Sequence, residues 1–259
     1  MTVSVPPYPP GRNILAGKTV LVTAAAGTGI GFATAKRCLE EGATVMISDI
    51  HERRLGEAAD ALASVGSRPA TRLCNVTKED DVQGLVDAAV AELGHIDVLV
   101  NNAGLGGYAR LVDMTDAQWQ SVLDVTLNGT FRMTRAALRH MLPRGAGAVV
   151  NNASVLAWRA QEGQAHYAAA KAGVTAFTRC VAMEAAESGV RVNAVAPSIA
   201  MHEFLAKVTP PGLLDSLTQR EAFGRAAETW EVANVIVFLA SDYASYMTGE
   251  VVSVSSQHP

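Results

Sequence analysis

Short apolar runs alternate with longer segments of helical periodicity along most of the chain. The runs predict strands at residues 19–23, 44–48, 70–74, 98–100, 148–151, 191–194 and 251–254. The helical patterns cover 31–41, 52–65, 78–93, 116–141, the segment around 167–171, and 229–240. Such alternation is typical of parallel strands joined by crossover helices, and nearly continuous apolar strands fit a sheet covered on both faces. The pattern predicts an α/β fold with a doubly wound sheet of about seven parallel strands.

Two segments depart from this rhythm. Residues 1–15 contain four prolines among the first ten positions, which predicts an extended arm ahead of one domain that covers 16–259. The arm either packs on a neighbouring subunit or is disordered. Residues 198–223 are long for a loop and form either a lid or a disordered insert. A lid is favoured because ligands of open parallel sheets bind outside the carboxyl ends of the strands.

Composition narrows the classes of function. The chain has 259 residues, of which 49% are hydrophobic and 18% charged, with a formal net charge of -4. This balance fits a soluble globular protein and offers no basic surplus for nucleic acid. Without a stretch long enough for a membrane span, or a recognisable signal or transit peptide, we expect a cytoplasmic protein that has no membrane partner. Three cysteines without C-x-x-C spacing and six scattered histidines argue against a disulfide framework and a bound metal.

Tyr167 and Lys171 are one helical turn apart, which places both on one face of a helix. A phenol has an ordinary pKa of about 10, and a nearby ammonium favours the phenolate and lowers that pKa. The pair therefore predicts a general acid/base. The solvated face of an alanine-rich helix can carry the same two residues, so this interpretation depends on the surrounding motifs.

A glycine-rich turn follows the first predicted strand and leads into a helix. Its central residues are Gly27, Thr28, Gly29 and Ile30. Backbone N–H groups in such a turn can approach a pyrophosphate, although a small-residue turn for tight helix packing is the alternative. About 20 residues later, Asp49 stands where a carboxylate can bind an adenosine ribose and repel a 2′-phosphate, or where it can cap the next helix. The position favours NAD, while Arg53 and Arg54 leave NADP open.

Several motifs occur together in one order. After the glycine-rich turn come Asn101-Asn102-Ala103-Gly104, then Ser154, then Tyr167-x-x-x-Lys171. Together they resemble the short-chain dehydrogenase/reductases of the compact one-domain type, over about residues 18–254. The resemblance implies a single-domain Rossmann-type fold, a nicotinamide cofactor, and hydride transfer between a secondary alcohol and a ketone.

The resemblance also implies the roles of individual residues. Ser154 would bind the substrate oxygen and Tyr167 would transfer the proton, while Lys171 would hold the nicotinamide ribose and help to lower the pKa of Tyr167. The implied cofactor contacts are Gly27, Thr28, Gly29, Ile30, Asp49, Asn75, Val76, Asn102, Ala103, Gly104, Tyr167, Lys171, Pro197 and Ile199. No metal ligand is implied.

The chain differs from the family pattern at several positions, among them Pro197-Ser198, where the family has a P-G turn, and the place near His202 where it has a threonine. Three further differences bear on the site. Ala24 stands where glycine is usual, so the turn must form around Gly27. Asn75 replaces an aspartate that faces the adenine, and its amide oxygen can still accept a hydrogen bond. Thr126 replaces the asparagine that is assigned to a water-mediated proton relay, and Asn128, two residues later, need not face the site.

By the family layout, the substrate pocket favours a bulky, partly apolar ketone or alcohol. Its expected lining is Leu105, Gly106, Gly107, Tyr108, Leu156, Trp158, Arg159, Gln161, Gln164, Met201, Phe204 and Leu205. Arg159 is a candidate partner for an anionic group. The stretches 151–154, 158–161, 197–200 and 257–259 resemble bacterial reductases of steroid degradation, which act on the coenzyme A thioester of a methyl-indanone fragment.

Two alternative functions stay open at this point. One is a 3-oxoacyl-carrier-protein reductase of fatty acid synthesis, and the other is a dinucleotide-sensing protein that kept the fold and lost catalysis. The joint presence of Ser154, Tyr167 and Lys171 favours an enzyme. Small residues at 168–186 would allow a close helix contact, and the resemblance implies a homotetramer.

Overall fold

The computed structural model describes residues 2–202, 205 and 212–256. Within these residues, seven parallel strands form one sheet in the order β3-β2-β1-β4-β5-β6-β9. The strands are β1 (Thr19–Val22), β2 (Thr44–Asp49), β3 (Ala70–Leu73), β4 (Val98–Asn101), β5 (Gly147–Asn152), β6 (Val190–Pro197) and β9 (Val251–Val254). The predicted Rossmann-type doubly wound sheet is confirmed. An unpredicted pair of short strands, β7 (Ala200–Met201) and β8 (Ala227–Glu228), follows β6.

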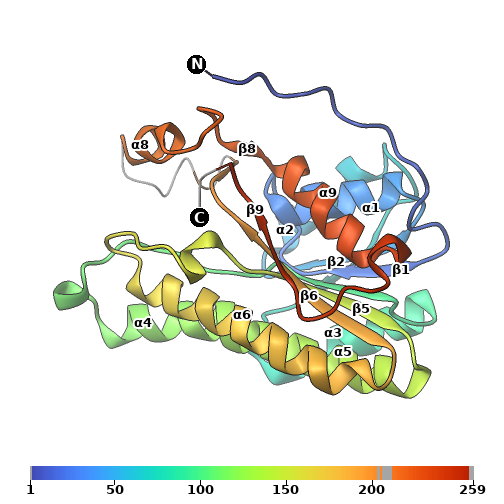
Figure 1. The fold of residues 1–259 in the computed structure, drawn as a ribbon. Coiled ribbons are helices and arrows are strands. Elements are labelled where there is room, and N and C mark those ends of the chain that lie inside the picture. Colours follow the sequence, from blue (N-terminus) through green and yellow to red (C-terminus); the bar gives the residue numbers. More distant parts are fainter. Residues whose placement is uncertain (1, 203–204, 206–211, 257–259) are drawn as a thin grey trace.

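Alternation of side chains along the strands builds a core on each face of the sheet. Val20 and Val22 belong to one cluster, and Leu21, between them, belongs to the other. The helices of the first face are α1 (Ile30–Glu40), α2 (Glu52–Leu62) and α9 (Thr229–Ala240), and those of the second face are α3 (Glu79–Leu93), α5 (Gly129–Arg144) and α6 (Ala165–Ala186). Figure 1 shows α1 and α9 on one side of the sheet and α5 and α6 on the other. None of the described helices is long and apolar enough to cross a membrane.

The helix predicted at 116–141 is interrupted. It consists of α4 (Asp116–Leu123), a π-helical turn at Asp124–Asn128, and α5. Val76 packs so closely on Gly129 that a Cβ there would lie 2.6 Å from the valine Cγ2. The irregular turn therefore brings Thr126 and Gly129 against neighbouring loops, which the helical periodicity alone could not show.

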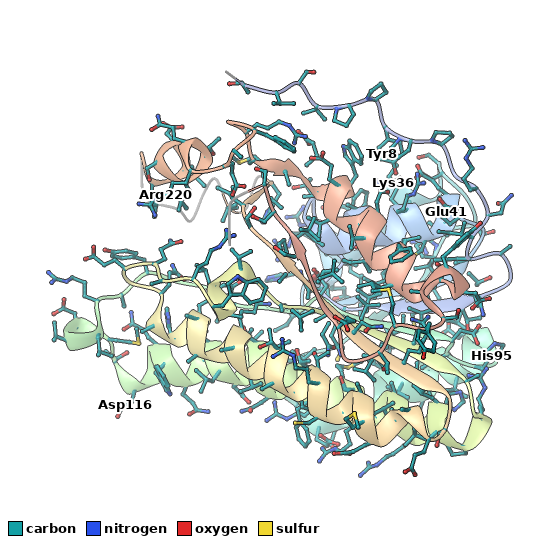
Figure 2. The ribbon with its side chains drawn as sticks, viewed as in Figure 1. Tyr8, Lys36, Glu41, His95, Asp116 and Arg220 are labelled. Carbon is teal, nitrogen blue, oxygen red and sulfur yellow. The ribbon has the colours of Figure 1, made fainter. Side chains whose placement is uncertain are left out.

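The proline-rich arm docks on its own domain, an arrangement that the sequence did not predict. Arg37 of α1 donates hydrogen bonds to the carbonyls of Pro9 and Pro10, at 2.6 and 3.2 Å. Tyr8 packs edge to face on Trp230 with 5.2 Å between ring centroids, and Lys36 lies over its ring (Figure 2). These contacts attach the arm to α1 and to the start of α9.

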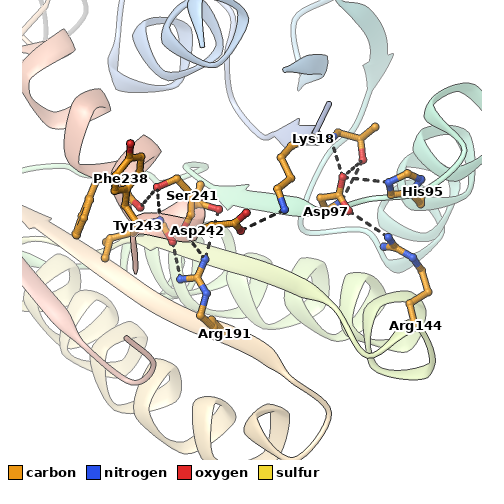
Figure 3. Close-up of polar contacts among 12 residues, drawn as sticks. Lys18, His95, Asp97, Arg144, Arg191, Phe238, Ser241, Asp242 and Tyr243 are labelled. Atoms are coloured by element: carbon orange, nitrogen blue, oxygen red, sulfur yellow. Dashed lines mark hydrogen bonds and ion pairs between the residues drawn. The ribbon is translucent and has the colours of Figure 1, made fainter. Parts of the chain in front are cut away.

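The amino end of the sheet carries a network of paired charges (Figure 3). Asp97 accepts hydrogen bonds from the Thr19 backbone N–H at 2.9 Å and from Arg144 at 3.1 Å, and it contacts His95 at 3.0 Å. Burial alone would raise the pKa of Asp97, but these partners hold the pKa below its ordinary value. Arg191 donates to the Leu239 and Ser241 carbonyls at the end of α9. Asp97 and Arg191 therefore both have hydrogen-bond partners at this end of the sheet.

The predicted lid region is described only in part. Residues 203–204 and 206–211 lie outside the described residues, and the expected pocket residue Phe204 is among them. The predicted amphipathic segment forms α8 (Leu213–Gln219). After it, the buried Glu221 accepts a hydrogen bond from the Ser256 hydroxyl at 2.8 Å, and the Phe223 carbonyl accepts one from the Val3 N–H at 2.8 Å. Both ends of the described chain therefore contact the segment that follows α8.

Candidate active site

Ser154, Tyr167 and Lys171 converge at the carboxyl end of the sheet. Ser154 follows β5, and the other two residues lie one turn apart near the start of α6. The Ser154 hydroxyl hydrogen-bonds Tyr167, and the Lys171 Nζ lies 5.5 Å from the tyrosine ring centroid. Ser154 also accepts the Leu156 N–H at 3.2 Å, so it satisfies its own turn while it contacts the phenol.

Burial shifts the pKa values of this pair in opposite directions. It raises the pKa of Tyr167 to about 12, and the hydrogen bond from Ser154 offsets only part of this effect. It lowers the pKa of Lys171 to about 8. In the protein by itself burial therefore outweighs any lowering of the Tyr167 pKa, and the lowering expected from Lys171 together with the oxidised nicotinamide stays a prediction. The Lys171 ammonium donates to the Asn152 carbonyl. The phenol is therefore fully protonated at neutral pH, the form that can donate a proton.

The glycine-rich turn leaves the start of α1 open. Its N-cap, Gly29, provides no side-chain cap, and a Cβ at Gly27 would meet nothing within 4 Å. Gly27 has φ +98°, and Ala24 also adopts a left-handed conformation with φ +50°, so the turn uses two left-handed residues rather than Gly27 alone. Free N–H groups at a helix N-terminus suit a pyrophosphate.

Asn102 holds that turn in place. Its Nδ2 donates to the carbonyls of Thr23 and Ala24 at 3.2 and 2.9 Å. The backbone N–H groups of Asn102 and Ala103 both donate to the Thr23 Oγ1, at 3.0 and 3.1 Å. Gly104 follows, where a Cβ would lie 3.5 Å from the Lys171 Nζ. The Asn102-Ala103-Gly104 motif thus joins the glycine-rich turn to the catalytic face.

Asp49 ends β2 beside the turn, as expected. It accepts the Ala26 N–H at 3.3 Å and the His51 N–H at 3.1 Å. Burial raises its pKa, and the hydrogen bond from Ala26 opposes that change. The carboxylate therefore both orders the turn and presents a negative group beside it.

Asn75 is used differently from the expectation. Its amide oxygen, the proposed acceptor for the adenine, accepts the N–H and the hydroxyl of Thr77 at 3.0 and 2.8 Å. The oxygen is committed to a local turn, so its amide nitrogen is the better group for an adenine contact. Val76 is buried against Gly129.

Thr126 is fully buried and supports the loop after Gly104. Its hydroxyl accepts the Leu105 N–H at 3.0 Å and donates to the Leu105 carbonyl at 3.2 Å. Its own carbonyl accepts the Thr130 hydroxyl at 2.8 Å. Asn128 donates to Asp124 at 3.2 Å, away from the site. Thr126 is thus a loop support whose carbonyl retains one lone pair for a water.

Pro197 and Ile199 lie at the end of β6 and just after it. Pro197 pairs with Val254 of β9, and the Ile199 carbonyl accepts the Ala227 N–H at 2.9 Å. His202 lies near the glycine-rich turn, since a Cβ at Gly29 would be 4.0 Å from its Nδ1. These contacts bring the segment after β6 beside the turn after β1.

Two loops beside Tyr167 carry the expected substrate-pocket residues other than those of the predicted lid. They are joined by the Gln164 Nε2, which donates to the Gly107 carbonyl at 2.7 Å, and by the Ala109 N–H, which donates to the Gly163 carbonyl at 3.1 Å. Tyr108 and Trp158 are about half exposed. Arg159, the candidate for an anionic group, donates to the Ser255 hydroxyl at 3.4 Å, so it is tied to the segment after β9.

Two positions at the site were missed from the sequence. Gly31 packs so tightly that a Cβ would lie 2.4 Å from the Asn102 Nδ2 and 2.5 Å from the Ala24 carbonyl oxygen. Asn152 donates to the Asn102 Oδ1 at 2.9 Å. The sequence signals that could have found them were the third glycine of the turn, for Gly31, and a polar residue two positions before Ser154, for Asn152.

Comparison with known proteins decides the family. A family model described as enoyl-(acyl carrier protein) reductase matches residues 24–256. A solved short chain dehydrogenase from Mycobacterium smegmatis is 57% identical, with a TM-score of 0.88 over 99% of each chain. The chain is a short-chain dehydrogenase/reductase.

Relatives of this short-chain dehydrogenase/reductase have named activities. A reductase of Mycobacterium tuberculosis is 61% identical over 100% of both chains and is named (5R,7aS)-5-hydroxy-7a-methyl-1-oxo-2,3,5,6,7,7a-hexahydro-1H-indene-carboxyl-CoA reductase. The cis-4-hydroxycyclohexanecarboxylate dehydrogenase of Sinomonas cyclohexanicum is 42% identical over 91% of this chain and 94% of its own. A 3-oxoacyl-(acyl-carrier-protein) reductase of Thermotoga maritima is 39% identical over 93% and 97%. The prediction of an NAD(P)-dependent oxidoreductase acting on an alcohol or ketone is confirmed, and the non-catalytic alternative loses its support.

Proposed function

We propose that this enzyme interconverts a ketone and a secondary alcohol on a bulky ring fragment carried as a coenzyme A thioester, with NAD as its cofactor. The identity of 61% over the full length to the mycobacterial indene-carboxyl-CoA reductase supports the substrate class. The observation that carries the chemistry is the Ser154 to Tyr167 hydrogen bond beside Lys171 and Gly104.

The proposed roles follow from that geometry. Ser154 holds the substrate oxygen, and the protonated Tyr167 donates to it during reduction. Lys171 holds the nicotinamide ribose with its buried ammonium. The bound dinucleotide would supply or accept the hydride. In the oxidising direction Tyr167 must lose its proton, and a positive charge beside the phenol would lower its pKa for that step.

The remaining contacts would hold the dinucleotide along the carboxyl end of the sheet. We assign the pyrophosphate to Gly27, Thr28, Gly29 and Ile30, the adenosine to Asp49, Asn75 and Val76, and the nicotinamide side to Asn102, Ala103, Gly104, Pro197 and Ile199. Asp49 supports NAD over NADP, because a buried carboxylate beside the turn would repel a 2′-phosphate.

The test is a turnover screen with NADH and NADPH in parallel. Its substrates are ring ketones carried on coenzyme A, the corresponding free acids, and a 3-oxoacyl thioester of acyl carrier protein. We expect the highest kcat/KM with NADH and the coenzyme A thioester. A preference for the carrier-protein thioester would favour the 3-oxoacyl reductase function, which the Thermotoga maritima relative supports. Tyr167→Phe should abolish turnover and keep NADH binding, and unchanged activity would reject the assigned mechanism.

A homotetramer in the cytoplasm is the proposed state of the enzyme. The exposed Met183 and Cys180 lie on α6, near the edge-to-face pair of Phe131 and Phe177. Thiol labelling tests this surface, because Cys180 is exposed in a single subunit while burial raises the pKa of Cys38 and Cys74 to about 12. Slow labelling of Cys180 in the assembled protein supports an interface at α6, and rapid labelling of an intact tetramer would place the interface elsewhere.

A further inference from the structure

Asn152 lies on the same face of the sheet edge as the catalytic serine. It ends β5, and Ser154 continues the extended backbone with φ −166° and ψ 154°. Side chains two residues apart on extended chain point to the same side. Asn151 points to the other side, where its amide bonds Asn101 and Thr178 at 2.9 Å each. The two adjacent asparagines therefore have different surroundings.

The side chain of Asn152 supports the glycine-rich turn through Asn102. The Asn102 nitrogen is committed to the Thr23 and Ala24 carbonyls, so its oxygen must face Asn152. The Asn152 Nδ2 donates a hydrogen bond to the Asn102 Oδ1 at 2.9 Å. Because an amide has its donors on one side and its acceptor on the other, this contact directs the Asn152 Oδ1 away from Asn102.

The backbone of Asn152 supports the other half of the site. Its carbonyl accepts the Lys171 Nζ, and Lys171 is only 3% exposed. One residue thus joins the turn proposed for the pyrophosphate to the lysine proposed for the nicotinamide ribose.

The Oδ1 of Asn152 is buried and has no hydrogen-bond partner among the described residues. A buried acceptor without a donor is costly, and such an exception calls for an explanation. An aliphatic side chain would fill the same place without that cost. A hydrogen-bond donor supplied by a ligand on the catalytic face provides the explanation.

We propose that the free Oδ1 of Asn152 accepts a hydrogen bond from the nicotinamide riboside half of the dinucleotide, while the Asn102 amide keeps its own bonds to the turn that would hold the pyrophosphate. This inference rests on the proposed function, since it requires a dinucleotide along this edge. The riboside hydroxyls are the donors of suitable chemistry next to Lys171.

Calorimetric titration of Asn152→Leu with NADH and with ADP tests the proposal, because ADP reaches only the adenosine and pyrophosphate half. We expect the NADH Kd to rise about tenfold, the size of one lost hydrogen bond, and the ADP Kd to rise less than about threefold. Substrate KM should change less than NADH KM. Asn152→Ser is the second variant if the leucine variant folds poorly, and its smaller hydroxyl should restore part of the NADH affinity.

Asn193→Leu is the matched control. It removes a similarly buried amide whose partners are the Met247 carbonyl and the Glu250 N–H, and the ratio of the NADH and ADP affinities should stay that of the wild type. Equal losses of NADH and ADP affinity in Asn152→Leu, or no loss, overturn the inference and leave the proposed function standing. Wild-type protein that binds no NADH at all overturns both.

Discussion

At the amino end of the sheet, Asp97 accepts hydrogen bonds from Thr19 and Arg144. At the carboxyl end, Lys171 donates to the Asn152 carbonyl and pairs with no anion among the residues that the structure describes. The pKa of Asp97 is lowered by its partners, and the pKa of Lys171 is lowered by burial itself. Partners stabilise the charged form in the first case, and burial destabilises it in the second. Strongly perturbed pKa values are common at functional sites, and the burial of the Lys171 ammonium is such a case.

The largest expected effect separates two lysines at opposite ends of the sheet. Lys171→Met should lower kcat/KM by about 100-fold to 10,000-fold, because it removes the ammonium proposed to hold the nicotinamide ribose beside the proposed general acid. Lys18→Met removes the partly exposed ion pair with Asp242 and should change stability by less than about 1 kcal/mol, with kcat/KM unchanged. Steady-state kinetics and thermal unfolding of both variants check this contrast, which fails if the two lose similar activity.

The second prediction concerns stability at the amino end. Asp97→Asn should lower the unfolding free energy by about 1–3 kcal/mol, since several donors lose a charged acceptor, and kcat/KM should stay unchanged. The folded pKa of Asp97 is depressed, so its contribution is present above the unfolded pKa of about 3.9 and is lost as pH falls through the folded pKa. Urea unfolding at pH 7 and pH 3 should show a smaller difference from wild type at pH 3. If Asp97→Asn and wild type differ equally in unfolding free energy at both pH values, the charge of the Asp97 carboxylate does not cause the loss of stability.

Thr126 tests whether a fully paired residue near the site matters for activity. Thr126→Val keeps the shape but leaves the N–H and carbonyl of Leu105 without their partner. We expect kcat/KM to fall about tenfold, the equivalent of about 1.4 kcal/mol, because the loop beside Tyr167 shifts. Thr126→Ser retains the hydroxyl and should retain most of the activity. A serine variant as poor as the valine variant would assign the effect to packing.

The smallest effect is the pH dependence of cofactor affinity. The pKa of Lys171 is about 8, so its ammonium is lost as pH rises past that value, and NADH affinity should fall several-fold between pH 7 and pH 9. The folded pKa of Lys171 lies below its unfolded value of about 10.4. At pH values between these two, the unfolded state binds more protons than the folded state, so the free energy of unfolding rises with pH in this range. In Lys171→Met, neither NADH affinity nor the free energy of unfolding measured in urea should show this dependence on pH. If either dependence persists, a titratable group other than Lys171 causes it.

The residues at the site differ in how well the sequence predicted them. The sequence predicted Tyr167 and Lys171 as a pair because their spacing places them on one helix face, and it predicted Ser154 through the resemblance to the short-chain dehydrogenase/reductases. The local use of Asn75 and the support that Thr126 gives to Leu105 were not predictable, because they depend on which backbone groups lie nearby. The rise in the pKa of Tyr167 through burial was not predictable for the same reason, since burial depends on the whole packed structure.

The sequence by itself determined the layers and the chemistry of this protein, because strand and helix periodicities and the ordered motifs are local properties of the chain. The tertiary structure decided which polar groups are paired. It placed Asn102 and Asn152, 50 positions apart, in one hydrogen bond and docked the arm on α1. Hydrogen-bond satisfaction and burial are set by neighbours that are distant in the sequence. For this reason only the folded chain shows that the Asn152 Oδ1 has no hydrogen-bond partner within the described part of the protein.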